Sequence, residues 1–470
     1  MILTQEQVEI IQVAKTLKIN ETLKINAFAG TGKTTTLIAI TNEIIDKRFL
    51  YLAFNNDIVS DAKKKFKNNV FATTVNGLAY RKIVMENKYK IFLNGFKAID
   101  VSELLNVPIE DAHDILKIYT YFCNSNAKEI NSDEVRYYPK RVTSWSYAKE
   151  FYQLIKSKKI ECDHSFYLKE YELQGFAREL KYDYVLLDEA QDTNPVTLSI
   201  FNQIESRKIL VGDTHQTIYQ FRDSVNAMKV VSSEHTLYLT TTYRCNKEIV
   251  TIANIVLTKF KNENKKLQSG VVNQDKNISN VAYISRTNFE LISLINSLES
   301  FNLMKGVDDI FGLSKAVHQL FVGKQIKQEK YSFLNKIKDN VEKKYSNKNI
   351  NQEQLLKLIK EELKSYSEKI NDIELQGAIR NANMFKGYLY VLENKAKEKH
   401  SSKSNHILIT GHSSKGLEFD KVVVCKDFKN PCEYDEKDFI AEANLLYVVV
   451  TRAKKEISFA NEGLLDDLIH

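Results

Sequence analysis

Long apolar runs and paired cysteines are both missing from this sequence. No stretch approaches the roughly 20 apolar residues needed to cross a bilayer, so we expect no membrane-spanning segment. The five cysteines are odd in number and scattered, without a Cys-x-x-Cys pair, which argues against a disulfide framework or a structural zinc site. We therefore expect reduced thiols in a cytoplasmic protein.

The composition that is present is ordinary for a globular protein. A chain of 470 residues is long enough for two to four domains, at about 100–200 residues per domain. Hydrophobic residues make up 43% and charged residues 27% of the chain. The net charge of +7 fits an anionic partner but is also found in proteins without one. Composition alone leaves the partner open.

Short β-type runs alternate with longer amphipathic stretches along the chain. This pattern is typical of parallel sheets joined by crossover helices. An early set of runs lies at residues 50–54, 184–187 and 209–211, and a later set at 237–239, 281–285, 407–410 and 422–424. The two sets predict two α/β domains.

Two blocks rich in lysine and aromatic residues with helical spacing interrupt these sets, and we expect them to be mostly helical inserts. The predicted organisation is a first domain at 1–84 and 181–232 with an insert at 85–180, and a second domain at 233–288 and 401–470 with an insert at 289–400. In the second insert, Leu355, Ile359 and Leu363 recur at helical spacing beside charged residues, which predicts a solvated amphipathic helix.

A glycine-rich segment carries the strongest single signal. It follows a β-type run and precedes a helical stretch, as phosphate-binding loops do. Its glycines would let backbone N–H groups turn towards phosphate oxygens, Lys33 would neutralise the β and γ phosphates, and the Thr34 hydroxyl would hold Mg²⁺. The predicted nucleotide-binding loop comprises Ala29, Gly30, Thr31, Gly32, Lys33, Thr34 and Thr35.

An apolar strand at 184–187 ends in two adjacent carboxylates, the layout of a Walker B strand. Asp188 would bind Mg²⁺ through water, and Glu189 would accept a proton from the water that attacks the γ-phosphate. Alone, such a pair could also cap a helix or lie in a solvated turn. Together with the phosphate-binding loop, it predicts an ATP hydrolase.

Two longer motifs make the pattern specific: Leu-Asp-Glu-Ala-Gln-Asp at 187–192 and Val-Gly-Asp-Thr-His-Gln-Thr-Ile-Tyr-Gln-Phe-Arg at 211–222. Both resemble the core of UvrD/Rep helicases of superfamily 1. Further matches follow in the family's order at residues 3–7, 242–244, 410–420 and 445–454, and several stretches look closest to the helicase core of F-box DNA helicases. The resemblance implies two RecA-like motor domains that bind ATP and Mg²⁺ and act on single-stranded DNA.

The resemblance also implies roles for individual residues around the nucleotide. An adenine sensor, an adenine-stacking ring and a ribose contact are implied at Gln7, Tyr243 and Glu418, respectively. Contacts to the γ-phosphate are implied for Gln216, Arg244 and Arg452. The residue chemistry agrees, because a γ-phosphate bound between two domains needs cations from the far side to offset developing charge.

A motor on single strands needs grips that tolerate any base, and stacked aromatic rings supply about 1–3 kcal/mol per base. Tyr219 and Phe221 are the best candidates, because they closely follow the phosphate-sensing Gln216. The resemblance adds further strand contacts at Phe54, Asn55, Thr74, Asn76, Arg286 and His412, although many family members have a histidine where Asn76 stands. Single-stranded and partial duplex DNA are the expected substrates, and the resemblance implies 3′-to-5′ movement.

Two alternatives of other classes remain. A phosphate-loop kinase or GTPase would share Lys33 and Asp188, but would not need arginines from a second α/β domain. The stronger alternative is an ATP-gated DNA-binding or remodelling subunit that works with a protein partner such as a nuclease or a repair factor, including in phage defence. Motor motifs do not specify cargo or pathway, so both a helicase and such a subunit fit the sequence.

Overall fold

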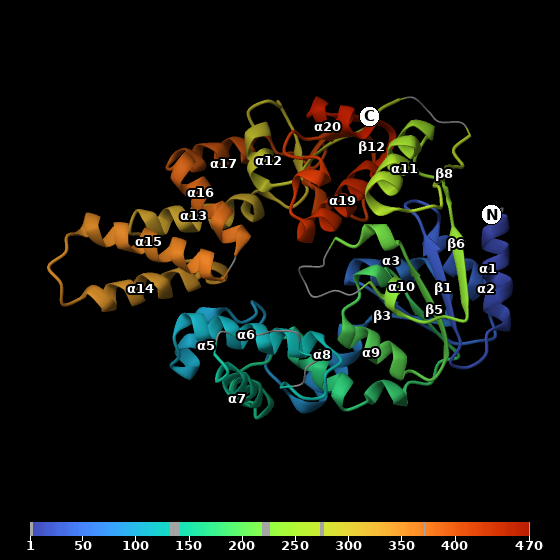
Figure 1. Ribbon diagram of the computed structural model, residues 1–470, viewed down its shortest axis with the longest axis horizontal. Helices are drawn as coiled ribbons and strands as arrows, with labels where there is room; N and C mark the ends of the chain where they lie inside the picture. Colours follow the sequence, from blue (N-terminus) through green and yellow to red (C-terminus); the bar gives the residue numbers. More distant parts are fainter. Residues whose placement is uncertain are drawn as a thin grey trace.

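A computed structural model describes residues 3–131, 135, 139, 141–218, 226–272, 277–370 and 372–469 (Figure 1). It contains two parallel sheets with helices on their faces, and two helical lobes that lie on one side of them. The α/β architecture with two RecA-like domains is therefore as predicted. In the described ranges, no helix combines the length and apolar character that a bilayer crossing requires.

The first sheet has six parallel strands in the order β3-β2-β4-β5-β1-β6. Its strands are β1 (Thr22–Ala27), β2 (Phe49–Ala53), β3 (Val70–Thr74), β4 (Tyr184–Leu187), β5 (Arg207–Gly212) and β6 (His235–Leu239). Strands β2 and β4 are buried along their whole length, which explains their continuous apolar sequences. The helices of this part are α1 (Gln5–Thr16), α2 (Lys33–Glu43), α3 (Asn56–Lys65), α9 (Pro195–Gln203) and α10 (Ala227–Val230).

One strand was assigned to the wrong sheet. The run at 237–239 was predicted to belong to the second domain, but β6 pairs in parallel with β1, with Leu23 opposite His235 and Ala27 opposite Leu239. Leu239 thereby packs in the core of the first sheet. Apolar periodicity identifies a strand but not its neighbour, so the sequence could not reveal that the first sheet extends beyond residue 232.

The second sheet has five parallel strands in the order β10-β11-β9-β12-β13. Its strands are β9 (Val281–Ser285), β10 (Asn302–Leu303), β11 (His406–Thr410), β12 (Phe419–Val424) and β13 (Ala453–Phe459), and a small pair, β7 (Thr241–Thr242) with β8 (Gln268–Ser269), lies outside it. The accompanying helices are α11 (Lys247–Lys261), α12 (Asn288–Leu294), α18 (Gly411–Ser414), α19 (Glu436–Val450) and α20 (Glu462–Ile469). A core of apolar residues from α11 and α19 packs on this sheet.

The first helical lobe follows β3. It contains α4 (Val75–Ala79), which continues into a π-helical stretch (Tyr80–Met85), and then α5 (Ala98–Leu105), α6 (Ile109–Asn124), α7 (Ser144–Lys156) and α8 (His164–Leu173). The second lobe contains α13 (Val307–Phe321), α14 (Phe333–Tyr345), α15 (Gln352–Lys369), α16 (Ile373–Phe385) and α17 (Tyr388–Lys399). The amphipathic helix expected around Ile359 is α15, which buries Ile359 and Leu363.

The two lobes touch, as Figure 1 shows for α14 and α5. The Lys336 ammonium lies 2.9 Å from a carboxylate oxygen of Asp100 and 2.9 Å from one of Glu103. Lys369 and Glu110 form a further ion pair at 2.7 Å. Contacts between the lobes therefore include partly exposed ion pairs as well as an apolar contact, because Ile109 of α6 packs against the core of the second lobe.

Candidate active site

The glycine-rich segment forms a tight loop between β1 and α2. Gly30 and Gly32 adopt left-handed conformations, with φ of 71° and 84°. A Cβ atom at Gly30 would lie 2.5 Å from Thr242 Oγ1 and 2.7 Å from Arg244 Cβ, so only glycine allows this close approach. The N-terminus of α2 begins at Lys33 and directs backbone N–H groups towards this loop, an arrangement suited to phosphate.

The other loop residues are fixed by neighbours on both sides. The Thr31 hydroxyl donates to the Phe28 carbonyl at 2.8 Å, and the Ala29 N–H donates to the Tyr447 hydroxyl at 3.3 Å. Thr34 and Thr35 lie half-buried in the first turn of α2. Because Tyr447 belongs to α19, the loop is held partly from the second domain.

Lys33, Asp188 and Glu189 meet at the carboxyl ends of β1 and β4. The Lys33 ammonium lies 2.7 Å from Glu189 Oε1. One Asp188 oxygen accepts the Glu189 N–H at 2.8 Å, and the other accepts the Tyr51 hydroxyl at 2.5 Å. Glu189 has a left-handed φ of 51°, which directs its side chain back towards Lys33 and is a strained conformation typical of functional sites.

Burial and charge set the protonation of this cluster. Burial, together with the adjacent Glu189, raises the pKa of Asp188. Burial also acts to raise the pKa of Glu189, but the ammonium groups of Lys33 and Lys415 outweigh it and lower that pKa to about 2. Glu189 is therefore ionised at neutral pH, which is the form that a general base requires.

Arg452 reaches this cluster from the amino end of β13. Arg452 is 2% exposed, and its guanidinium donates to the carbonyls of Val448 and Leu417, at 2.9 and 3.1 Å, and to Gln216 Oε1 at 3.3 Å. Burial, followed by the nearby Arg244 charge, lowers the pKa of Arg452 to about 9. A buried cation bonded to neutral acceptors is costly, so a bound anion at this point would be strongly favoured.

Gln216 and Arg244 complete the arrangement between the two sheets. Gln216 follows β5, and its amide donates to Asp213 Oδ2 at 2.7 Å while its oxygen accepts from Arg452. Arg244 Nε lies 2.9 Å from a Glu418 carboxylate oxygen, just before β12. The structure thus brings Gln216, Arg244, Arg452 and Glu418 together.

The predicted adenine-side residues flank the phosphate-binding loop. Gln7 forms a capping box at the start of α1, and its amide donates to the Thr36 hydroxyl at 3.0 Å. The Tyr243 N–H donates to the Gly30 carbonyl at 2.9 Å, and its ring is 54% exposed. An exposed ring beside the loop is available to stack on a base.

The donors near Lys33 fit a hard divalent cation. The Thr34 hydroxyl and the Asp188 carboxylate offer oxygen atoms, which Mg²⁺ prefers, usually together with substrate phosphates and waters. Among the described residues, no cluster of three or more His, Cys, Asp or Glu side chains is suited to hold a metal by itself. These residues therefore fit an ion that phosphate and water complete.

Four predicted DNA-binding residues lie at the carboxyl ends of neighbouring strands of the first sheet. Phe54 comes after β2 and is 40% exposed. Asn55 and Thr74 cap α3 and α4, where their side-chain oxygens accept backbone N–H groups at 2.9 Å. Asn76 is exposed in the first turn of α4. Since β2 and β3 are adjacent and parallel, these residues lie at one edge of the sheet.

Arg286 and His412 follow β9 and β11, which are paired in the second sheet. Arg286 is held by Glu442, with its Nη2 2.7 Å from Glu442 Oε1 and its Nε 3.0 Å from Oε2. Burial, with Arg286 and Lys305 nearby, lowers the pKa of His412 to about 4, so its imidazole is neutral at physiological pH. These two residues lie at the sheet end opposite to Arg452 and Glu418.

The predicted stacking pair, Tyr219 and Phe221, lies outside the described residues. The two flanks of this segment are described and meet: the Asn226 amide donates to the Thr217 hydroxyl at 2.9 Å. Thr217 is tied to the second domain as well, because its carbonyl accepts the Asn444 amide at 2.7 Å.

Some residues of the site were not assigned a role from sequence, namely Tyr51, Gln191, Asp192, Asp213, Lys415 and Tyr447. All but Tyr51 lie inside the quoted motifs, so their position was the available signal. Tyr51 is an aromatic residue in the middle of a buried strand, and nothing in its local sequence distinguishes it from a core residue.

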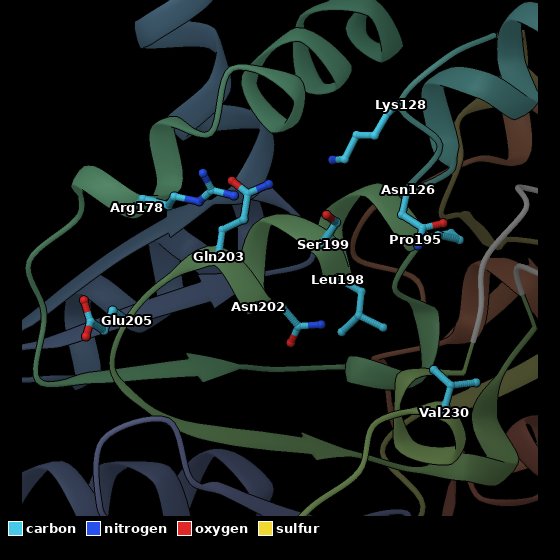
Figure 2. Close-up of a pocket in the computed structure, with 10 residues that line it drawn as sticks. All are labelled: Asn126, Lys128, Arg178, Pro195, Leu198, Ser199, Asn202, Gln203, Glu205 and Val230. Carbon is cyan, nitrogen blue, oxygen red and sulfur yellow. The ribbon is translucent and has the colours of Figure 1, made fainter. Parts of the chain in front are cut away.

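A separate cavity of about 750 Å³ opens beside α9 (Figure 2). Leu198 and Ser199 of α9 line it, together with Lys128 and Arg178, and Figure 2 shows Arg178 beside Gln203. Its described lining residues are different from the residues predicted to bind nucleotide or DNA. The cavity is therefore distinct from the site between the sheets.

Family models match both halves of the chain. The model of the UvrD/REP helicase N-terminal domain matches residues 4–235, and that of the UvrD-like helicase C-terminal domain matches residues 292–461. A model of the viral superfamily 1 RNA helicase core domain matches residues 147–331. The first two models cover most strands of the two sheets, and residues 236–291, which include β9 and Arg244, lie between the two matches.

Curated relatives agree with these matches. F-box DNA helicase 1 of Gallus gallus is 30% identical over 96% of this chain and 48% of its own length. F-box DNA helicase protein 1 of Schizosaccharomyces pombe is 29% identical over 97% of this chain and 57% of its own length. The chain thus spans about half the length of these two relatives. Because the two UvrD-like models together match residues 4–235 and 292–461, the chain belongs to the UvrD-like helicase family.

Proposed function

We propose that this chain is an ATP-dependent single-stranded DNA translocase and DNA helicase. The observation that carries the proposal is the contact between Arg452 and Gln216, which joins the second domain to the first beside the Lys33 and Glu189 pair. A buried arginine that reaches across a domain boundary to a side chain of the proposed nucleotide site is the arrangement that ATP-driven closure requires.

In the proposed reaction, ATP lies with its phosphates on the loop around Gly30 and Gly32. Lys33 exchanges Glu189 for the β and γ phosphates, so that Glu189 can accept a proton from water. The water oxygen bonds to the γ-phosphorus as the bond to the β,γ-bridging oxygen breaks, giving ADP and phosphate. When bound, Mg²⁺ would be held by Thr34 and Asp188 and would offset phosphate charge.

Arg244 and Arg452 stabilise the charge that develops on the γ-phosphate. Both approach from the side of the second sheet, so they can act fully only when the two domains are close together. After hydrolysis, release of phosphate removes the anion between them, and two neighbouring guanidinium groups then repel each other. ATP binding therefore closes the site, and product release opens it.

The proposed DNA path runs over the carboxyl ends of strands in both sheets. In the first sheet it passes Phe54 and Thr74 at the ends of β2 and β3, and in the second sheet it passes Arg286 and His412 beyond the ends of β9 and β11. Alternate closing and opening of the two domains would shift their grips along the strand. The aromatic residues Tyr219 and Phe221, next to the phosphate-sensing Gln216, provide a short covalent link between hydrolysis and the strand.

We further propose 3′-to-5′ movement in DNA repair, recombination or replication. The relatives' names support DNA unwinding as the activity. The test is a pair of partial duplexes that differ only in overhang polarity, assayed for strand displacement with ATP and Mg²⁺. Unwinding from the 3′ overhang is expected, and unwinding from the 5′ overhang alone would overturn the polarity. Failure on both substrates, with DNA-stimulated hydrolysis intact, would favour a remodelling subunit that depends on a partner such as a nuclease or repair factor.

A further inference from the structure

One lysine crosses from the second sheet domain to the first. Lys415 follows α18, in the segment between β11 and β12. Its ammonium pairs with the Asp192 carboxylate and donates to the Gln216 carbonyl at 2.6 Å. Asp192 comes after β4 and Gln216 after β5, so Lys415 joins the ends of two strands that carry the proposed catalytic residues.

This ion pair is almost fully buried. The Lys415 and Asp192 side chains are 9% and 1% exposed. The second Asp192 oxygen, Oδ1, is buried and has no hydrogen-bond partner among the described residues, so Asp192 depends strongly on Lys415. Breaking a buried pair leaves an uncompensated charge, and the contact is therefore sensitive to any relative movement of the two domains.

Asp192 in turn contacts the side chain that holds Glu189. The Gln191 amide nitrogen donates to Asp192 Oδ2 at 3.2 Å and also donates to Glu189 Oε2. The Gln191 oxygen accepts the Asp213 N–H at 3.1 Å, which fixes the orientation of the amide. A continuous series of contacts therefore runs from Lys415 through Asp192 and Gln191 to Glu189.

The other end of the Lys415 segment lies at the proposed DNA edge. His412 stands three residues earlier, on α18, the short helix that Lys415 follows. Two contacts stiffen this helix: the hydroxyls of Thr410 and Ser413 are hydrogen-bonded at 2.8 Å, and the Ser414 hydroxyl donates to the Gly411 carbonyl at 2.7 Å. His412 and Lys415 are therefore joined by a short segment that is held together by hydrogen bonds.

We propose that Lys415 is a positioning residue through which single-stranded DNA bound at α18 controls the orientation of Glu189. This inference rests on the proposed function above. In the arrangement observed, both Glu189 oxygens are engaged, one by Lys33 and one by Gln191. Bound single-stranded DNA that moves α18 changes the ion pair between Lys415 and Asp192. The shifted Asp192 reorients the Gln191 amide, and Glu189 is then released to accept a proton from water.

The test measures steady-state ATP hydrolysis by the full chain with and without a single-stranded oligothymidylate. Lys415→Met is expected to lower the ratio of stimulated to unstimulated kcat by about tenfold, the usual effect of losing one charged contact that acts on the transition state. DNA affinity should change much less than this ratio. Lys415→Arg, which keeps a charged donor, should recover part of the stimulation.

Two further variants separate positioning from folding. Lys421→Met removes a more exposed lysine of β12, which pairs with Glu456, and should keep the wild-type ratio. In the double variant Lys415→Met/Asp192→Asn, the unpaired carboxylate is gone, so its Tm should exceed that of Lys415→Met while stimulation stays low.

Wild-type stimulation in Lys415→Met would overturn the inference. A double variant that recovers stimulation together with Tm would also overturn it, because the pair would then be structural only. If the wild-type protein itself shows no stimulation by DNA, the proposed function fails and this inference fails with it. The wild-type ratio therefore tests the proposed function, and the ratio of Lys415→Met tests this inference.

Discussion

Arg452→Ala is expected to remove most DNA-stimulated ATP hydrolysis and to change the fold little. The guanidinium lies between the two sheet domains and contacts Gln216 Oε1 at 3.3 Å. Its other hydrogen bonds go to the Val448 and Leu417 carbonyls and to the Thr451 hydroxyl, all from the second domain. The substitution therefore removes the cation aimed at the first domain and leaves its scaffold in place.

The expected magnitude differs greatly between catalysis and stability. An arginine that stabilises γ-phosphate charge contributes about 10³–10⁵ to kcat, and the lower limit corresponds to about 4 kcal/mol of transition-state stabilisation. For the free energy of unfolding, Arg452→Ala leaves acceptors unpaired but also removes a buried charge. These effects partly cancel, so we expect a loss of about 1–2 kcal/mol.

The assay compares kcat for ATP in the presence of single-stranded DNA with DNA affinity and Tm measured on the same preparations. Arg452→Lys serves as the matched control. It keeps the positive charge, but its single ammonium cannot reproduce the hydrogen bonds of the guanidinium to Gln216 and to the Val448 and Leu417 carbonyls. It should give intermediate activity. A near-normal kcat in Arg452→Ala, or a fall in kcat explained fully by unfolding, would refute the two-domain site.

Three further substitutions or conditions test other parts of the site. Burial lowers the pKa of His412 to about 4, so its imidazole is neutral from pH 8 to pH 5.5. The salt dependence of DNA binding should therefore have the same slope at pH 8 and at pH 5.5, and a slope steeper by about 0.7 at pH 5.5 would indicate a charged His412 contact. Gly30→Ala should raise the KM for ATP and lower Tm, since its Cβ would collide with Thr242; unchanged values would contradict the close approach. Tyr51→Phe removes the hydroxyl that donates to Asp188, so denaturant unfolding should show a free energy of unfolding lower by about 1 kcal/mol, and ATP hydrolysis a kcat lower several-fold. An unchanged kcat would mean that Tyr51 has a structural role only.

Local sequence was sufficient for the residues that lie in contiguous motifs. The loop around Gly30 and Lys33, and the carboxylates after β4, could be predicted because a strand, a turn and a helix follow each other directly. The arginines at 244 and 452 were predicted to face the same nucleotide only through the family resemblance. Their observed proximity depends on how two sheets pack together.

What the sequence did not reveal depends on contacts between distant segments. Tyr51 bonds Asp188, which is 137 positions away, and Lys415 bonds Asp192, which is 223 positions away. The pairing of β6 with β1 was missed for the same reason. Periodicity reports which face of an element is buried, but it does not report which other element covers that face.

The most direct measurement of the proposed motor is ATP hydrolysis with and without single-stranded DNA, in the wild-type protein and in Glu189→Gln. Wild-type hydrolysis should rise strongly with DNA. Glu189→Gln should bind ATP and DNA normally but hydrolyse ATP at least about 100-fold more slowly, because it lacks the base that accepts the water proton. Hydrolysis that ignores DNA, or a Glu189→Gln variant with a near wild-type rate, would contradict a DNA-driven ATPase built on Lys33, Glu189 and Arg452.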